Sequence, residues 1–266
     1  MIIALFTDFG VRDAYVAQMK GVILGINADV AVIDLNHEVA AFDVRQAAYL
    51  LAASSRYLPA GSIVVTVVDP GVGTARRPLL CGTQSDRWFV GPDNGVFTHV
   101  LAEQGFREAY ELTEAAYFAP RVSSTFHGRD IFGPVAAHLA GGVPANHFGP
   151  RVETLTTFPV SPPRVVDEAA VGEIVHIDHF GNVVTNVAPD LLGGLQIGQH
   201  LMVTINERRW TVPFCSTYGM QPEGRLMALV SSNDTLEIAL PQGNASAQVK
   251  APVGTAITFQ RQPRAA

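Results

Sequence analysis

Two rhythms of apolar and polar positions alternate in the first part of the chain. Residues 2–6 form a short, wholly apolar run, and the segment 14–26 repeats its apolar side chains at helical spacing. Strands are then expected at 31–35, 62–68 and 87–90, and a second helix at 42–55. Because Val- and Ile-rich strands that alternate with helices favour a covered parallel sheet, the pattern predicts an α/β fold with a mostly parallel sheet and helices on both faces.

The rhythm changes after a proline-rich stretch at residues 158–164, which is typical of a linker. Short apolar runs separated by Gly, Pro, Asn and Asp then predict strands at 172–177, 200–205, 209–212, 226–230, 236–240 and 256–260. The chain is therefore expected to form two domains, an N-terminal α/β domain over residues 1–160 and a smaller all-β domain, a barrel or sandwich, over residues 161–266.

Composition narrows the possible functions. Of the 266 residues, 48% are hydrophobic and 16% charged, which suits packed cores and argues against disorder. The net charge of -6 and the scattered basic residues argue against a nucleic-acid partner. The N-terminus lacks a basic leader and no segment has the roughly 18 uninterrupted apolar residues of a membrane span, so no membrane partner is expected. Cys81 and Cys215 offer neither a disulfide framework nor a paired metal spacing, and a cytoplasmic protein is predicted.

Candidate chemistry begins where the apolar run 64–68 stops at Asp69, which is followed by Pro-Gly-Val-Gly. Proline cannot continue the hydrogen-bonded ladder and glycine permits close backbone approach, so Asp69 is expected where a strand opens into a loop at a cleft. Asp8 and Asp93 are expected at the same edge of the sheet, where ligands of parallel sheets gather. Arg76 follows on the loop, and with Asp69 it forms either a reactive pair or a structural ion pair.

A second polar cluster, residues 123–130, contains His127. With the Asp69 and Arg76 pair it offers a carboxylate, a guanidinium and an imidazole, which we interpret as the reaction centre. Taken alone, a histidine such as His127 is more often a hydrogen-bonded structural residue than a catalyst. Metal binding is the weaker alternative. Neither His127 with Asp130 or His138, nor Asp178 with His179, has the compact spacing of a zinc site.

Two acidic residues near the first strand suggest ligand contacts. At the end of a central strand the Asp8 carboxylate loses hydration, which costs free energy unless a ligand binds it. A ribose diol supplies two O–H donors that match the two carboxylate oxygens. Asp13 lies immediately before the first helix, where it serves either as an N-cap or as a ligand contact.

In the second domain, Asn182 follows a glycine, and a turn explains it as well as a binding role does. Its amide offers both a donor and an acceptor and can read a purine edge. The ring of Tyr218 is able to stack on a base, although an aromatic residue near a turn more often serves plain packing. The chain has no complete Walker loop or G-x-G-x-x-G pattern, so ATP hydrolysis and NAD binding are not expected.

Five ordered motifs together resemble one protein family, the S-adenosylmethionine hydroxide adenosyltransferases, which are relatives of the bacterial fluorinase and chlorinase. The resemblance extends over nearly the whole chain. The motifs are Thr7-Asp8-Phe9-Gly10 with Asp13 and Met19-Lys20-Gly21, Asp69-Pro70-Gly71-Val72-Gly73 with Arg76, Gly91-Pro92-Asp93-Asn94-Gly95, Thr125-Phe126-His127-Gly128-Arg129-Asp130, and Asp178-His179-Phe180-Gly181-Asn182.

The resemblance implies that water or hydroxide attacks C5′ of S-adenosyl-L-methionine and releases adenosine and L-methionine, without a metal or cofactor. The implied catalytic residues are Asp69, Arg76 and His127, with His127 accepting the proton directly or through a water. The implied substrate contacts are the ribose at Asp8, the methionine part at Asp13, Asp178 and Ser232, and the adenosine part at Phe126, Asn182, Tyr218 and Ala245. The resemblance also implies a homotrimer whose active sites lie between subunits.

Two other functions stay open at this point. Halide-using relatives lack the Asp and His of the hydrolytic set, so the presence of Asp69 and His127 argues for water, whereas Gly128 also fits a chloride-using halogenase. A module that binds S-adenosylmethionine or adenosine without turnover is the third hypothesis, and it predicts saturable binding with no product.

Overall fold

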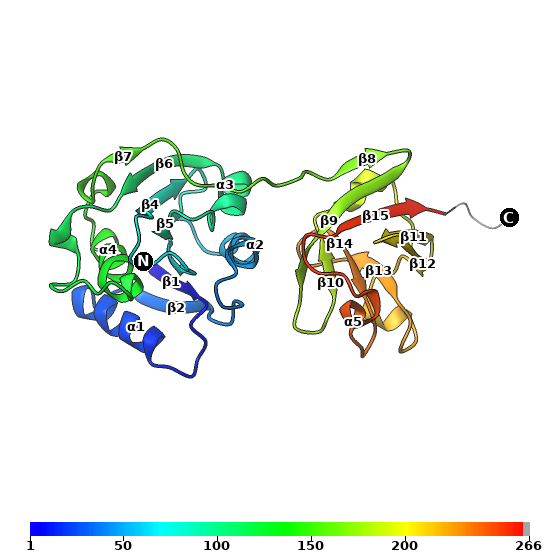
Figure 1. Ribbon diagram of the computed structural model, residues 1–266, viewed down its shortest axis with the longest axis horizontal. Helices are drawn as coiled ribbons and strands as arrows, with labels where there is room; N and C mark the ends of the chain where they lie inside the picture. The colour runs from blue at the N-terminus through cyan, green and yellow to red at the C-terminus, as the bar shows by residue number, and fades with distance from the viewer. Residues whose placement is uncertain (263–266) are drawn as a thin grey trace. The chain divides into compact units, whose positions relative to one another are not determined.

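The computed structural model describes residues 1–262, and the chain divides into two compact units, Met1–Phe158 and Pro159–Ala266. Each unit has its own hydrophobic core. Figure 1 shows most of the helices in the N-terminal unit and a strand-rich C-terminal unit. The expected combination of an α/β part and a barrel-like β part is confirmed.

The N-terminal unit is built on a seven-stranded sheet in the order β2-β1-β3-β5-β4-β6-β7. The strands β2, β1, β3 and β5 are parallel, and β4, β6 and β7 continue the sheet in antiparallel pairs. The bounds are β1 Ile2–Thr7, β2 Ala31–Asn36, β3 Ile63–Val67, β4 Pro78–Thr83, β5 Trp88–Pro92, β6 Phe106–Glu111 and β7 Arg151–Val152.

Helices cover both faces of this sheet, and Figure 1 shows α1 beside α4 and α2 beside α3. Along β1, Ile3 and Leu5 pack into one core cluster with α1 and α4, while Ala4 and Phe6 pack into the other with α2 and α3. This alternation follows from the two-residue period of a strand that is buried on both faces. The bounds are α1 Tyr15–Ile26, α2 Val44–Ser55, α3 Thr98–Gln104 and α4 Gly133–Ala140.

Two details at helix starts differ from the sequence expectations. Helix α1 has Ala14 in its N-cap position without a side-chain cap, and Asp13 is exposed, so the N-cap interpretation of Asp13 is wrong. Helix α2 begins at Val44 and not at Phe42, because the Asp43 side chain accepts a hydrogen bond from Gln46 N and caps the helix there. Phe42 is left outside the helix with a left-handed φ of 68°.

The C-terminal unit is a strongly curved antiparallel sheet in the order β12-β11-β15-β9-β10-β14-β13, with β8 paired to β9. A bridge between Phe214 and Ala228 links the β12 and β13 ends, which makes the sheet barrel-like. The core includes Ile174, Val203 and Phe259. The bounds are β8 Arg164–Val166, β9 Ala169–Ile177, β10 Val183–Thr185, β11 His200–Ile205, β12 Arg208–Pro213, β13 Met227–Val230, β14 Leu236–Ala239, β15 Ala256–Arg261 and α5 Ala245–Val249.

Within residues 1–262, no helix has the length and apolar character needed to cross a membrane. Cys81 and Cys215 are both buried and unpaired, as the sequence predicts. Burial raises the pKa of the Cys81 thiol to about 12, so it stays protonated and behaves as a small hydrophobic residue.

Candidate active site

Asp69 and Arg76 form a closely packed ion pair on the loop that follows β3. Arg76 Nε donates to both carboxylate oxygens of Asp69, at 3.0 and 2.9 Å, and Arg76 Nη2 also donates to Oδ2. The side chain of Arg76 is 9% exposed and that of Asp69 is 4% exposed. A bidentate arrangement of this kind fixes the orientation of the guanidinium relative to the loop.

Arg76 also reaches His127, with 2.8 Å between Arg76 Nη2 and His127 Nδ1. A guanidinium has no lone pair to offer, so Nδ1 must accept this hydrogen bond. The neutral ring therefore carries its proton on Nε2, and among residues 1–262 nothing bonds to that N–H. The one available lone pair of His127 is already occupied, which argues against this ring as a direct proton acceptor.

His127 is held in this neutral form by its surroundings. Burial lowers the pKa of His127 below its ordinary value, and the positive charge of Arg76 lowers it further, while Asp69 and Asp130 oppose the shift. Protonation at Nδ1 would direct an N–H at the Arg76 guanidinium. The three groups therefore form a chain in which charge and hydrogen-bond direction agree only when His127 is neutral.

The two loops that carry these residues touch through their backbones. Gly73 has a φ of 75°, and a Cβ added there would lie 2.3 Å from Ser124 O, so only glycine allows the contact. On the other side, Asp130 is 2% exposed and accepts from Ser123 N and from Arg129. His127 itself precedes a π-helical turn, Gly128–Phe132, a conformation frequently found at functional sites.

The neighbouring residue Arg77 belongs to a different pair. Its Nε and Nη2 lie 2.9 and 2.5 Å from Asp93 Oδ2, and Asp93 Oδ1 accepts from Thr156 N. Asp93 thus lies directly after β5, as expected. Its carboxylate binds Arg77 and Thr156 N, so it anchors the chain after β7 and is not a free ligand contact. Of the two adjacent arginines, only Arg76 faces both Asp69 and His127.

A cavity of about 380 Å³ lies against this chain of groups. Four of the predicted residues line it together: Asp8, Asp69, Phe126 and His127. Asp13 does not line it, and its side chain is exposed. The structure thus brings together residues that lie up to 119 positions apart. Of the three proposed catalytic residues, Asp69 and His127 line the cavity, and Arg76 bonds to both of them.

Apart from Phe126, the aromatic residues that line this cavity were not predicted from the sequence. Phe9, Tyr15 and Phe126 form a triangle with ring centroids 5.4–5.6 Å apart. Phe42 is 71% exposed at the cavity, and its backbone N–H donates to Asp8 Oδ2 at 2.9 Å. Its left-handed φ is unusual for an aromatic residue and typical of a strained functional position, but a sequence pattern gives no sign of it.

A second group of predicted residues lies within the C-terminal unit. Asn182 Nδ2 donates to Asp178 Oδ2 at 2.9 Å, and Asp178 Oδ1 accepts from the backbone of Phe180 and Asn182. Ser246 N donates to Gly181 O, which places Ala245, the first residue of α5, beside the same turn. Asp178, Asn182 and Ala245 are thus neighbours, whereas Ser232 lies exposed in the turn between β13 and β14.

Tyr218 is tied to a residue that the sequence did not single out. Its hydroxyl donates to Glu237 Oε1 at 2.8 Å, and Glu237 is 3% exposed while Tyr218 is 45% exposed. Burial raises the pKa values of both Tyr218 and Glu237, and the negative charge of Asp178 adds to both shifts. The hydrogen bond raises the pKa of Tyr218 further and partly opposes the rise at Glu237. The acidic residue at 237 interrupts an apolar strand, and that interruption was the signal that could have found it.

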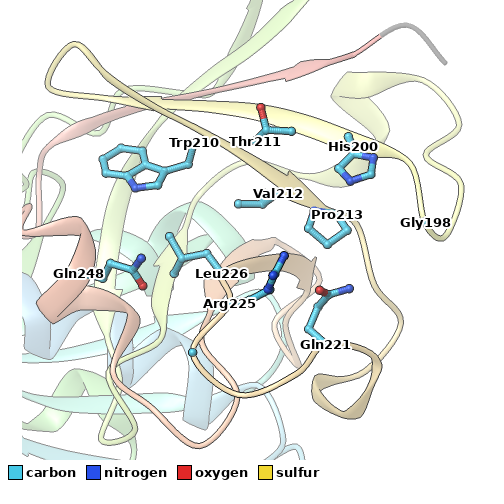
Figure 2. A pocket seen from close by; sticks show the side chains of 11 residues that line it. Gly198, His200, Trp210, Thr211, Val212, Pro213, Gln221, Arg225, Leu226 and Gln248 are labelled. Carbon is cyan, nitrogen blue, oxygen red and sulfur yellow. The ribbon is translucent and has the colours of Figure 1, made fainter. Parts of the chain in front are cut away.

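A hollow of about 540 Å³ also lies on the C-terminal unit (Figure 2). It is lined by His200 and Trp210 from β11 and β12 and by Gln221 and Arg225 from the segment before β13. Although it is larger than the cavity beside Asp69, it contains none of the predicted site residues and no carboxylate. We therefore place the candidate active site at the smaller cavity.

Comparison with known proteins gives consistent matches over both units. Family models described as the SAM hydroxide adenosyltransferase N-terminal and C-terminal domains match residues 3–149 and 172–258. An (R)-S-adenosyl-L-methionine hydrolase from Thermus thermophilus is 40% identical over 250 residues, covering 90% of this chain and 91% of the relative. A fluorinase from Nocardia brasiliensis is 30% identical, covering 90% and 89%. The crystal structure of an uncharacterized conserved protein from Thermotoga maritima is 37% identical with a TM-score of 0.93, covering 98% and 100%.

Proposed function

The chain belongs to the SAM hydroxide adenosyltransferase family, and we propose that it hydrolyses S-adenosyl-L-methionine to adenosine and L-methionine by attack of water or hydroxide at C5′. One observation carries the proposal beyond family membership. Asp69, Arg76 and His127 form a continuous hydrogen-bonded chain beside a cavity that Asp8 also lines. The identities to hydrolases exceed the identity to the fluorinase and support water over halide.

The chemistry asks mainly for placement, because a sulfonium is already a good leaving group. The nucleophile oxygen forms a bond to C5′ as the C5′–S bond breaks, the bonding electron pair stays on sulfur, and methionine leaves as a neutral thioether. One proton is released to solvent. Holding the oxygen in line with the breaking bond is the larger part of the catalytic task.

The three catalytic groups divide this task. His127 donates from Nε2–H to the nucleophile, and Arg76 retains the N–H groups of Nη1, which its bonds to Asp69 and His127 do not use. Two hydrogen-bond donors favour the hydroxide form of the nucleophile over neutral water. Asp69 orients Arg76 and balances its charge. Hydroxide needs no general base, which agrees with the occupied lone pair of His127.

The remaining residues bind the substrate in this proposal. Asp8 accepts from the ribose hydroxyls, and Asn182 and Ala245 contact the adenine edge. Phe126 and Tyr218 pack on the nucleoside. Asp13 and Asp178 hold the methionine ammonium, and Ser232 also contacts the methionine part. A neighbouring copy in a homotrimer completes each site, so dilution to monomers abolishes turnover. Two buried free cysteines support a reducing, cytoplasmic setting.

The decisive experiment incubates the protein with each sulfonium epimer of S-adenosylmethionine in H₂¹⁸O and separates the products by chromatography with mass detection. We expect equimolar methionine and adenosine with ¹⁸O at the 5′ position. The (R) epimer is expected to react, since the curated relative is named for it. A chelator is expected to leave the rate unchanged, because no metal or cofactor takes part.

Two outcomes would replace the proposal. Formation of 5′-chloroadenosine in excess chloride, without labelled adenosine, would indicate a halogenase. Saturable binding without any product would indicate a binding module. Adenosine without the label would contradict the proposal, because the new oxygen on C5′ would then not come from water.

A further inference from the structure

A buried histidine lies next to the candidate ribose contact, and the proposed reaction does not use it. His37 is 7% exposed and follows β2 directly. Its Nδ1 lies 2.8 Å from Thr7 Oγ1, and its Nε2 lies 3.0 Å from Asp34 Oδ1. Lys20 Nζ lies 2.7 Å from the other oxygen of Asp34. Four side chains from α1, β1 and β2 thus form one hydrogen-bonded chain.

The direction of each bond in this chain follows from chemistry. An ionised carboxylate only accepts, so His37 Nε2–H donates to Asp34. The neutral ring then has a lone pair on Nδ1, which accepts from the Thr7 hydroxyl. Partial burial opposes ionisation of Asp34, but hydrogen bonds from His37 and Lys20 outweigh it and lower the pKa of this carboxyl. Every member of the chain has one consistent role.

The chain ends on the turn that carries Asp8. Thr7 Oγ1 accepts from the backbone N–H of Phe9 at 3.2 Å. This hydrogen bond joins the two residues on either side of Asp8. The backbone carbonyl of His37 accepts from Gly10 N at 2.7 Å. Both the ring and the backbone of His37 therefore hold the turn, one side of Asp8 through Thr7 and the other through Gly10.

The arrangement of Asp34, His37 and Thr7 has the residue types of a nucleophilic triad, but Thr7 is 0% exposed. A hydroxyl with no accessible surface cannot attack a substrate, and its proton and its lone pair are both in use. The chain is consequently suited to orient a neighbour and not to react itself.

We infer that Thr7, His37 and Asp34 are positioning residues that set the orientation of Asp8 for the two hydroxyls of a ribose. This inference rests on the proposed function, because it takes Asp8 as the ribose contact. Asp8 Oδ2 already accepts from Phe42 N, so its remaining acceptor positions are usable only if the backbone turn is fixed. A diol needs both carboxylate oxygens in one orientation, and a small rotation of Asp8 loses one of the two bonds.

The test measures binding of adenosine and of 2′,3′-dideoxyadenosine to the full-length protein by calorimetry. We expect the wild type to bind adenosine at least about 10-fold more tightly, because a diol makes two charge-assisted hydrogen bonds. Thr7→Val should reduce the preference to below about 3-fold, and Thr7→Ser should restore it. Asp34→Ala, at a side chain that is 46% exposed and outside the core, should weaken the preference without unfolding the protein.

The matched control is Thr66→Val. Thr66 is also 0% exposed, lies on the adjacent strand β3, and its hydroxyl has no hydrogen-bond partner among the described residues. It should keep the full preference for adenosine.

The outcomes separate this inference from the proposed function. Loss of the preference in Asp8→Asn together with its survival in Thr7→Val and Asp34→Ala would overturn the positioning role alone. A preference that survives Asp8→Asn would overturn both the positioning role and the ribose assignment. Absence of adenosine binding to the wild type would overturn the proposed function and the inference built on it.

Discussion

The two units satisfy their buried and half-buried carboxylates in different ways. In the N-terminal unit, Asp69, Asp93 and Asp130 are each paired with an arginine. In the described part of the C-terminal unit, residues 159–262, no carboxylate is ion-paired with Lys or Arg. Asp178 instead accepts from backbone N–H groups and the Asn182 amide, and Glu237 accepts from a phenol.

The two kinds of pairing differ in how rigid the carboxylate is and in how much negative charge it keeps. A bidentate guanidinium neutralises its carboxylate and fixes the geometry of the pair, which suits groups that must place a nucleophile. A carboxylate held by neutral donors keeps its negative charge and remains able to attract a cation. The N-terminal site is thus suited to place the nucleophile, and the Asp178 turn is suited to bind a cationic group of the substrate.

The largest effect is expected from breaking the pair in the N-terminal site. Arg76→Ala removes a donor to the nucleophile and should lower turnover by on the order of 10³-fold. It also leaves Asp69 buried without a counter-charge, so the free energy of unfolding should fall by about 3–5 kcal/mol. Initial rates of adenosine formation and denaturant melts measure the two effects.

Arg77→Ala is the matched control, since it breaks the neighbouring pair with Asp93 and does not touch His127. We expect it to lose stability while turnover stays within about threefold of the wild type. Equal losses of turnover in both variants would mean that the Asp69–Arg76 pair is only structural.

The contrast between the units also explains what could be predicted from the sequence. Asp8, Asp69 and Asp93 were predictable at one sheet edge, because parallel strands end together and the apolar runs stop at these residues. The antiparallel β4 and β6 were not predicted: β4 begins with a proline, and β6 is the half-polar stretch Phe106–Glu111. His37, Phe42 and Glu237 were missed because their roles depend on tertiary neighbours that no local spacing encodes.

The next effect tests whether the ordered chain in the N-terminal unit needs neutral His127. His127→Ala should lower turnover by roughly 10²-fold, because it removes a hydrogen-bond donor to the nucleophile. His127→Asn should lower it less, because the Asn carbonyl still accepts from Arg76 and its amide still donates. A general-base role predicts instead that Asn and Ala are equally inactive. Steady-state rates with both variants distinguish these cases.

The acidity of His127 gives an independent check through the pH profile. The folded pKa lies below 6.5, so the wild type should keep its activity below pH 6.5 and lose it only as pH falls through the lowered pKa. The unfolded chain binds this proton first, so stability from this group also declines as pH falls below 6.5. Because ionisation of the bound water also changes the rate, kcat/KM from pH 5 to 9 is measured together with an NMR titration of the His127 ring. A ring titration centred above pH 6.5 would contradict the arrangement with Arg76.

A smaller effect is expected in the C-terminal unit, where charge and not geometry is at stake. Asp178→Asn should raise KM for S-adenosylmethionine by roughly 10- to 100-fold with little change in kcat, because a hydrogen bond to a charged group contributes about 1.5–3 kcal/mol. The variant should not affect an analogue that lacks the α-amino group. Asp190→Asn, in an exposed turn of the same unit, is the control. A fall in kcat with KM unchanged would remove Asp178 from substrate binding.

The smallest effect concerns Glu237, whose carboxylate is buried against Tyr218 and repelled by Asp178. Glu237→Gln keeps an acceptor for the Tyr218 hydroxyl, so turnover should stay within about threefold of the wild type. Because the folded pKa of Glu237 is raised above its unfolded value, the stabilisation from its protonated form is full below pH 4.5 and declines as pH rises through the folded pKa. The amide variant should therefore unfold at a higher temperature than the wild type at pH 8, and the difference should vanish near pH 4.5.

Glu223→Gln, at an exposed position, should show no such pH dependence. A variant that is less stable at pH 8 would mean that the negative charge of Glu237 has a counter-charge in the folded protein, and the contrast between the two units would then fail.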